Sequence, residues 1–153
     1  MPQKRPMYIP EHSSFLQEKF INYIMKQGKK TIARRIFADT LKRVEEKTKT
    51  NPVKIFEKAV ENAKPLMEVK AQRVGGAVYQ VPREVKPGRQ LILSFRWILG
   101  AARTKKGSNL SVRLTDEMID ASNGTGSAIK KKEDTHRMAD ANRAFAHFAK
   151  YKK

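Results

Sequence analysis

With 153 residues, the chain is long enough to form one domain with a hydrophobic core. It carries 33 Lys and Arg against 15 Asp and Glu, a formal net charge of +18, which points to a polyanionic partner. Nucleic acid is the polyanion that so basic a protein most often binds, so we expect a nucleic-acid-binding protein. The absence of cysteine excludes a disulfide framework, cysteine metal sites and thiol catalysis, and no apolar run approaches the about 20 residues of a membrane span.

Residues 1–12 are expected to form an extended basic arm, because three prolines disfavour a helix there while Lys4 and Arg5 supply charge. No apolar run follows these basic residues, so the segment does not resemble a secretory signal, and we expect a soluble intracellular protein without a membrane partner. Residues 13–149 are expected to form a single helical domain, and residues 150–153 a basic tail.

Three helices are predicted in the first part of the chain. The first begins at a plausible capping box of Ser14 and Gln17, and its apolar spacing continues until Gly28. The second carries apolar residues at helical spacing over 32–44, with basic residues on or beside its polar face. The third begins at the Asn51–Pro52 cap and ends at the next proline.

A β-hairpin is predicted over about residues 66–86, where apolar and polar residues alternate with a period of two. Gly75 and Gly76 suit the tight turn between the strands, because glycine tolerates the positive φ that such turns require. In this register Glu68 faces Arg83, so opposite charges are expected to meet across the strands.

Three more helices are predicted after the hairpin. The first follows Pro87–Gly88, and the second runs from about Leu110 to the turn at Asn123–Gly124. The last begins near Ser127 and is expected to continue through Phe148, because apolar residues keep helical spacing that far. The predicted fold class is therefore mostly α, a six-helix domain with a β-hairpin inserted between helices three and four.

Arg89, Arg96 and Arg103 are spaced by seven residues and therefore lie nearly on one line along the fourth helix. Guanidinium groups two turns apart could bind successive phosphates with two hydrogen bonds each. A solvated helix face explains the same spacing equally well.

Two further basic clusters allow the same pair of interpretations. On the hairpin, Arg73 could contact RNA and Tyr79 could stack on a base or sugar, or Tyr79 could instead pack on the helices. On the last helix the cluster could bind an anion or be a solvated face; its members are Lys130, Lys131, Lys132, Arg137 and Arg143.

Catalytic patterns are weak. His136 and Asp140 are four residues apart on a predicted helix, which is the spacing of an ordinary surface pair. The sequence has no phosphate-binding loop, no zinc-protease helix motif and no nucleophile elbow. We therefore expect no enzyme, no cofactor and no metal site.

Two longer motifs, VGGAVYQVP at residues 74–82 and KEDTHRMA at residues 132–139, are specific enough to indicate a family. They resemble ribosomal protein seven of the small subunit, in its bacterial and organellar form. Shorter matches extend this resemblance over about Glu18 to His147.

The resemblance implies a structural protein that binds the 3′ major domain of small-subunit rRNA as a primary binder and nucleates assembly of the subunit head. It implies a place at the subunit interface near the decoding region, exit-site tRNA and mRNA, beside small-subunit ribosomal proteins nine and eleven. We expect no homo-oligomer. The ribosome would be that of a bacterium, a mitochondrion or a plastid.

Carried over to this chain, the resemblance and the basic clusters together give two sets of candidate contact residues. The expected rRNA contacts are Lys4, Arg5, Lys29, Lys30, Arg34, Arg35, Arg89, Arg96, Arg103, Lys130, Lys131, Lys132 and Arg137. The residues expected near exit-site tRNA and mRNA form the hairpin tip, which comprises Arg73, Val74, Gly75, Gly76 and Tyr79.

The alternative from another class is a free-standing regulator whose hairpin or helix reads base edges in a duplex groove. Such regulators usually dimerise, and no long apolar heptad seam is apparent in the sequence. Sedimentation separates the two hypotheses, because a ribosomal protein cofractionates with small subunits whereas a regulator stays in the free fraction.

Overall fold

The computed structural model describes residues 7–150, so the candidate contacts Lys4 and Arg5 lie outside the described residues. The described chain is mostly α-helical with one antiparallel hairpin between the third and fourth helices, which confirms the predicted fold class. In chain order the elements are α1 (Phe15–Ile24), α2 (Lys30–Thr48), α3 (Pro52–Ala63), β1 (Met67–Val74), β2 (Ala77–Glu84), α4 (Pro87–Thr104), α5 (Leu110–Ser122), α6 (Ser127–Ala141) and the 3-10 helix η1 (Arg143–Lys150).

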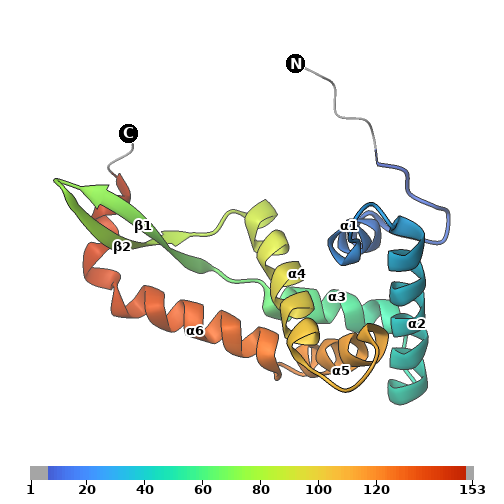
Figure 1. The fold of residues 1–153 in the computed structure, drawn as a ribbon. Helices are drawn as coiled ribbons and strands as arrows, with labels where there is room; N and C mark the ends of the chain where they lie inside the picture. Colours follow the sequence, from blue (N-terminus) through green and yellow to red (C-terminus); the bar gives the residue numbers. More distant parts are fainter. Residues whose placement is uncertain (1–6, 151–153) are drawn as a thin grey trace.

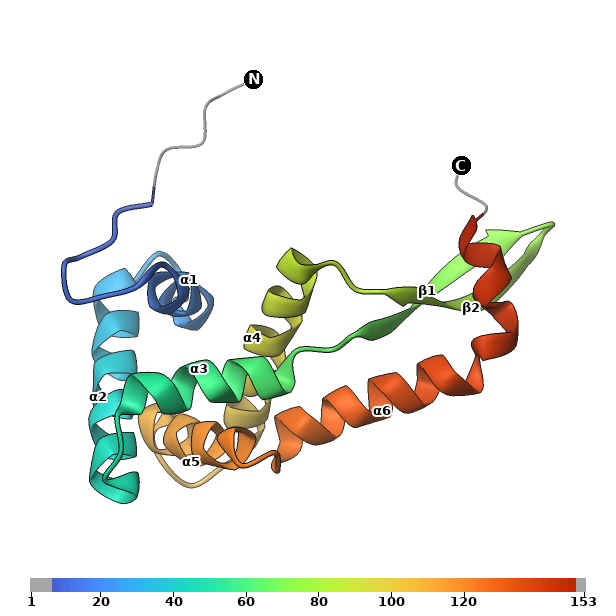
Figure 2. The ribbon, with the colours of Figure 1, turned by 180° about the vertical axis from the view of Figure 1, so that it is seen from behind.

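The elements form two regions that differ in shape (Figure 1). Helices α1 to α5 pack into a compact body, whereas β1, β2 and η1 form a hairpin unit that projects from it. Helix α6 leaves the body beside α4 and runs along β1 toward the far end of the hairpin, where η1 turns back and lies against β2 (Figure 2).

The helix caps largely follow the sequence pattern. Ser14 Oγ accepts a hydrogen bond from the Gln17 backbone N–H at 3.2 Å, which confirms the predicted cap of α1. The Asn51 side chain likewise accepts from the Val53 N–H at 2.9 Å at the start of α3. Helix α1 ends earlier than predicted, at Ile24, because the residues before α2 form a turn that includes left-handed backbone.

Aromatic rings from four helices form the centre of the body. The Phe20 ring of α1 lies 5.7 Å from that of Phe37, 5.1 Å from that of Phe56 and 5.1 Å from that of Phe95, measured between centroids. All four side chains are buried, and Met118 of α5 completes the same cluster. Tilted and edge-to-face contacts of this kind add to the free energy gained by burying the rings.

The hairpin has the predicted turn and register. Gly75 and Gly76 connect the strands with φ values of 58° and 92°, which a residue with a Cβ adopts only with strain. Glu68 is paired with Arg83 across the strands, as predicted.

The expected charge contact between Glu68 and Arg83 was wrong. Arg83 donates a hydrogen bond to the Gln72 side chain on β1 instead. Glu68 pairs with Arg89, whose Nη2 lies 3.4 Å from its carboxylate, because the first turn of α4 begins beside the base of β1. The hairpin is therefore linked to α4 by an ion pair, and not closed by one of its own.

The prediction that the last helix continues through Phe148 was wrong. Helix α6 ends at Ala141 and the backbone continues as η1, in which the Phe145 and Phe148 rings lie 5.3 and 4.7 Å from the ring of Tyr79. A 3-10 helix has about three residues per turn, so residues three apart lie on one side. The aromatic spacing therefore suits η1 as well as an α-helix.

His136 contacts the base of the hairpin. Its Nε2 accepts a hydrogen bond from the Leu66 backbone N–H at 3.0 Å, just before β1. The predicted surface pair with Asp140 was wrong: across residues 7–150, no ion pair or hydrogen bond joins these two side chains. His136 instead gives a partner to a backbone N–H that the β-ladder leaves unpaired.

Candidate nucleic-acid interface

The structure separates the candidate basic residues into two groups. Some are neutralised or held by partners within the protein, and others have free side chains. A free side chain here is one that makes no ion pair or hydrogen bond within residues 7–150. Only free cations are available to phosphate without a competing internal partner, so the distinction narrows the candidate interface.

At the start of α2, the carboxylate of Glu18 takes up two of the candidate cations. Glu18 is only 1% exposed, and its Oε2 lies 3.1 Å from Lys30 Nζ and 2.9 Å from Arg34 Nη2. Burial alone would raise the pKa of Glu18, but the hydrogen bonds from Arg34 and Lys30 outweigh this and hold that pKa below its ordinary value. Lys30 and Arg34 thus join α2 to α1.

The two other candidates at this end of α2 differ from them. The side chains of Lys29 and Arg35 are exposed and free within the described residues. We therefore assign Lys29 and Arg35 to the candidate interface ahead of Lys30 and Arg34.

The arginine line on α4 is divided in the same way. Arg89 pairs with Glu68, and Arg103 Nη2 donates to the backbone carbonyls of Tyr23 and Ile24, at 3.4 and 3.3 Å, where α1 ends. These carbonyls have no partner within their own helix, so Arg103 stabilises the C-terminus of α1. Arg96, the middle residue, is exposed and free in the described part of the chain.

Helix α6 brings one free cation, Lys131, to the pocket that Arg96 also lines. Lys132 Nζ donates to the Asn62 carbonyl at 2.7 Å, and Arg137 lies 3.5 Å from Asp134. Lys130 and Lys131 are exposed and free among the residues described. Lys131 and Arg96 line one pocket of about 300 Å³ between α4 and α6, which Trp97 also lines.

The hairpin tip presents one free cation and one covered aromatic ring. Arg73 is exposed and free within the described chain, and Val78 beside it is 65% exposed. Tyr79 is half-buried under the Phe145 and Phe148 rings of η1. A base could stack on the covered part of the Tyr79 ring only if those rings moved.

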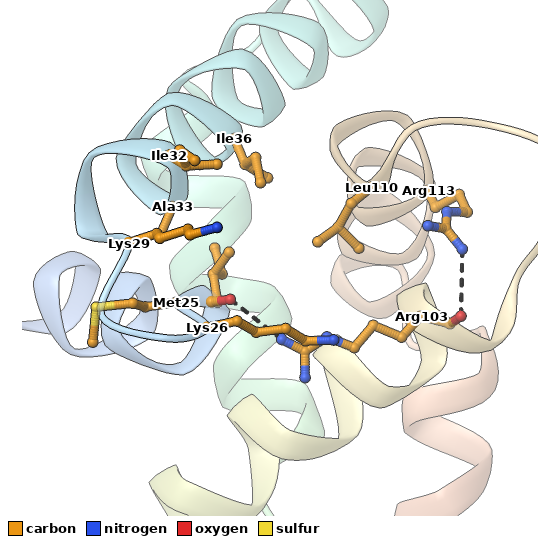
Figure 3. A pocket seen from close by; sticks show the side chains of 10 residues that line it. Met25, Lys26, Lys29, Ile32, Ala33, Ile36, Arg103, Leu110 and Arg113 are labelled. Atoms are coloured by element: carbon orange, nitrogen blue, oxygen red, sulfur yellow. Dashed lines mark hydrogen bonds between the residues drawn. The ribbon is translucent and has the colours of Figure 1, made fainter.

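A second pocket, which the sequence patterns did not indicate, lies where α1, α2, α4 and α5 meet. It has a volume of about 410 Å³, and Figure 3 shows Ile36 of α2 facing Leu110 of α5 across it, with Arg103 along one side. Lys26 and Arg113 are functional candidates that the sequence analysis missed. Lys26 belongs to the basic turn before α2, which the sequence does show, whereas Arg113 stands apart from any basic run.

The described residues contain neither a metal-ligand cluster nor a membrane-spanning helix. Nowhere in residues 7–150 do three or more His, Cys, Asp or Glu side chains gather closely enough to hold a metal ion. Within the same range, every helix is too short or too polar to cross a membrane.

Comparison with known proteins gives a consistent result. The family model described as ribosomal protein S7p/S5e matches residues 1–143. A small ribosomal subunit protein uS7 of Desulfovibrio desulfuricans is 51% identical over 148 residues, which cover 97% of this chain and 95% of that protein. The protein of the same name from Gloeothece citriformis is 50% identical, over 95% of this chain and 94% of that protein. The one from Natranaerobius thermophilus is 53% identical, over 91% of this chain and 89% of that protein.

Proposed function

Since the chain belongs to the ribosomal protein S7p/S5e family, and is therefore a structural component of the small ribosomal subunit and not an enzyme, we propose that it binds the 3′ major domain of the rRNA directly and nucleates assembly of the subunit head. Its relatives named here are bacterial ribosomal proteins, so its place is the ribosome. We propose a bacterial, mitochondrial or plastid ribosome as the more specific location.

The observation that carries this proposal is the set of free cations on the body and on α6. Their side chains come from the turn before α2, from α2, from α4 and from α6, and no carboxylate within residues 7–150 pairs with them; they are Lys26, Lys29, Arg35, Arg96, Lys130 and Lys131. Each such cation that meets a phosphate releases a counterion from the RNA, which is favourable at moderate salt. The body is thus suited to anchoring rRNA.

The hairpin tip supports a second part of the proposal. Residues 73–79 lie at the end of the projecting hairpin, away from the body (Figure 1). A tip that extends from an anchored body can reach a neighbouring RNA, and we propose that it lies near exit-site tRNA and mRNA. We further propose small-subunit ribosomal proteins nine and eleven as protein partners, on family resemblance alone.

The test is a filter-binding titration of the full chain against a transcript of the 3′ major domain, repeated at several salt concentrations. A transcript of the 5′ domain serves as the control RNA. If about six phosphates are engaged, affinity for the 3′ domain should fall about 1,000-fold between 50 and 200 mM salt. Equal affinity for both transcripts, or a nearly flat salt dependence, would contradict direct and specific anchoring.

Assembly of the head needs its own measurement. Small-subunit rRNA should be reconstituted with the other small-subunit proteins, with and without this chain, and analysed on a gradient. We expect particles without the chain to sediment more slowly and to lack the proteins of the head. A complete head formed without the chain would remove the nucleating role.

A further inference from the structure

The pocket at the junction of α1, α2, α4 and α5 combines two kinds of surface. Its wall includes several apolar side chains, and the most open of them is Ile32, which is 50% exposed. Ile36 and Leu110 continue the same apolar wall and are half-buried. An exposed isoleucine in a concave wall is the kind of surface that gains free energy when a ligand covers it.

Charge on the same pocket is of one sign. Among the residues that the structure describes, four of the ten that line it are basic and none is acidic; the basic ones are Lys26, Lys29, Arg103 and Arg113. In Figure 3 the Lys29 ammonium points into the space between α2 and α5. Cations that surround a concave site without a nearby carboxylate favour an anionic occupant.

Hydrogen bonds fix the walls of the pocket. Arg113 donates to the carbonyls of Arg103 and Lys105, which joins α5 to the C-terminus of α4. Arg103 in turn donates to the carbonyls of Tyr23 and Ile24 and so joins α4 to α1. The three helices are therefore held at the pocket before any ligand binds, which lowers the entropy cost of binding.

An anionic occupant with an apolar, flat part fits this combination. A paired RNA helix presents phosphates outward but keeps its base faces stacked, so it could meet the cations without covering the apolar wall. An unpaired nucleotide offers both its phosphate and its base face to the protein. The volume of about 410 Å³ is within the range of pockets that hold small organic molecules.

We propose that this pocket holds one unpaired nucleotide of the small-subunit rRNA, with its phosphate beside Lys26 and Lys29 and its base against Ile32 and Leu110. The inference rests on the proposed rRNA binding and adds a defined site to it. The pocket thereby selects RNA with an exposed single-stranded residue, which phosphate contacts alone do not do.

The test uses two variants of the full chain with matched controls. Ile32→Ser removes the open part of the apolar wall, and Val78→Ser removes an exposed apolar residue from the hairpin tip. Lys29→Gln removes a pocket cation, and Lys54→Gln removes an exposed α3 cation that has no partner within residues 7–150. Circular dichroism of all four variants should show unchanged helicity, since all four side chains are exposed.

Affinity for the 3′ major domain transcript should separate the variants. Ile32→Ser should weaken binding about fivefold by the same factor at every salt concentration, because it changes no charge. Lys29→Gln should weaken it several-fold at low salt and make the salt dependence shallower by about one unit of the logarithmic slope. Val78→Ser and Lys54→Gln should bind like the parent chain.

Chemical probing of the transcript then locates the nucleotide. The parent chain should protect one unpaired nucleotide from base alkylation, and that nucleotide alone should become reactive with Ile32→Ser. If the parent binds the transcript but Ile32→Ser matches Val78→Ser in affinity and footprint, the pocket proposal is overturned while rRNA anchoring stands. If the parent does not bind the transcript, the proposed function fails and this inference fails with it.

Discussion

The body buries many more of its apolar side chains than the hairpin unit does. In the body, rings from α1, α2, α3 and α4 lie in mutual contact and are shielded from water, as the packing of Phe20 with Phe95 illustrates. In the hairpin unit, the fully buried apolar residues Val81 and Val85 lie in the middle of β2 and just after its end, whereas Val78 at the tip is exposed. The comparison indicates that the body provides most of the folding stability, whereas the hairpin unit extends the protein away from the body.

The two regions also use arginine and lysine differently. In the body, several cations are committed to internal partners such as Glu18, and these contacts fix how the helices meet. At the tip, Arg73 has no such commitment within residues 7–150. Mutations in the body should therefore mainly change stability, whereas mutations of Arg73 at the tip should leave stability unchanged.

The largest effect on stability is expected at the centre of the body. Phe20→Ala should lower the free energy of unfolding by about 3–5 kcal/mol, because it leaves a cavity among the three rings that pack against Phe20. Urea denaturation followed by circular dichroism measures this loss. The matched change in the hairpin unit, Tyr79→Ala, should cost about 1 kcal/mol or less, since that ring is only half-buried. Equal losses would break the distinction between the two regions.

The next effect concerns the buried carboxylate of Glu18. Glu18→Gln keeps the shape of the side chain but removes its charge, and should cost about 1–3 kcal/mol because Lys30 and Arg34 lose their counter-charge. The cost stays below that of a fully buried pair, since water reaches both cations. Glu57→Gln, on the exposed face of α3, should leave the urea midpoint unchanged.

The Glu18 contribution should also depend on pH in a defined direction. Its folded-state pKa is held below the ordinary value of 4.5, so the folded state releases this proton more readily than the unfolded state does. The stabilisation is therefore fully present above pH 4.5 and is lost as pH falls through the folded pKa. The stability difference between parent and Glu18→Gln should shrink in that acidic range. A difference that stays constant there would contradict the role of the ionised carboxylate.

A smaller effect is expected where η1 covers the hairpin. Phe148→Ala removes a ring 4.7 Å from that of Tyr79, and should destabilise this contact by about 1 kcal/mol. Amide hydrogen exchange should become faster in β2 and η1 while exchange in α1 to α5 stays unchanged. Faster exchange throughout the body would show that the hairpin unit supports the core after all.

The smallest effect concerns RNA affinity alone. Arg96→Lys keeps the charge but loses the two-pronged guanidinium, so affinity for the 3′ major domain should fall about two- to fivefold with an unchanged melting temperature. Lys130→Arg, which adds such a group on neighbouring α6, should not weaken binding. Equal affinity of Arg96→Lys and the parent would return Arg96 to a solvated helix face.

Local sequence signals predicted much of this fold. Asn51 followed by proline places the start of α3, and two glycines set the hairpin turn and with it the strand register. The end of α6 could not be read in the same way. Phe145 and Phe148 are three residues apart, which fits one side of either kind of helix, and only their contact with Tyr79 from β2 favours η1.

The candidate interface was harder to predict than the fold, because sequence spacing does not show which cations are neutralised. Arg34 meets Glu18 from sixteen residues away, and Lys132 meets the Asn62 carbonyl from seventy. The pocket could not be predicted for the same reason, because Arg113 lines it only after α5 packs beside α4. Contacts between distant segments therefore decide which basic residues remain available to RNA.

The most direct test of the central claim, that the body anchors rRNA while the hairpin tip contacts exit-site tRNA, is to replace residues 73–78 by a short Gly-Ser turn. Tyr79 is retained so that its contact with η1 survives. Small subunits carrying this chain should be purified, and their head assembly and exit-site tRNA dissociation compared with those of the parent. We predict a complete head and faster dissociation of exit-site tRNA. Failed head assembly together with unchanged tRNA dissociation would contradict the account.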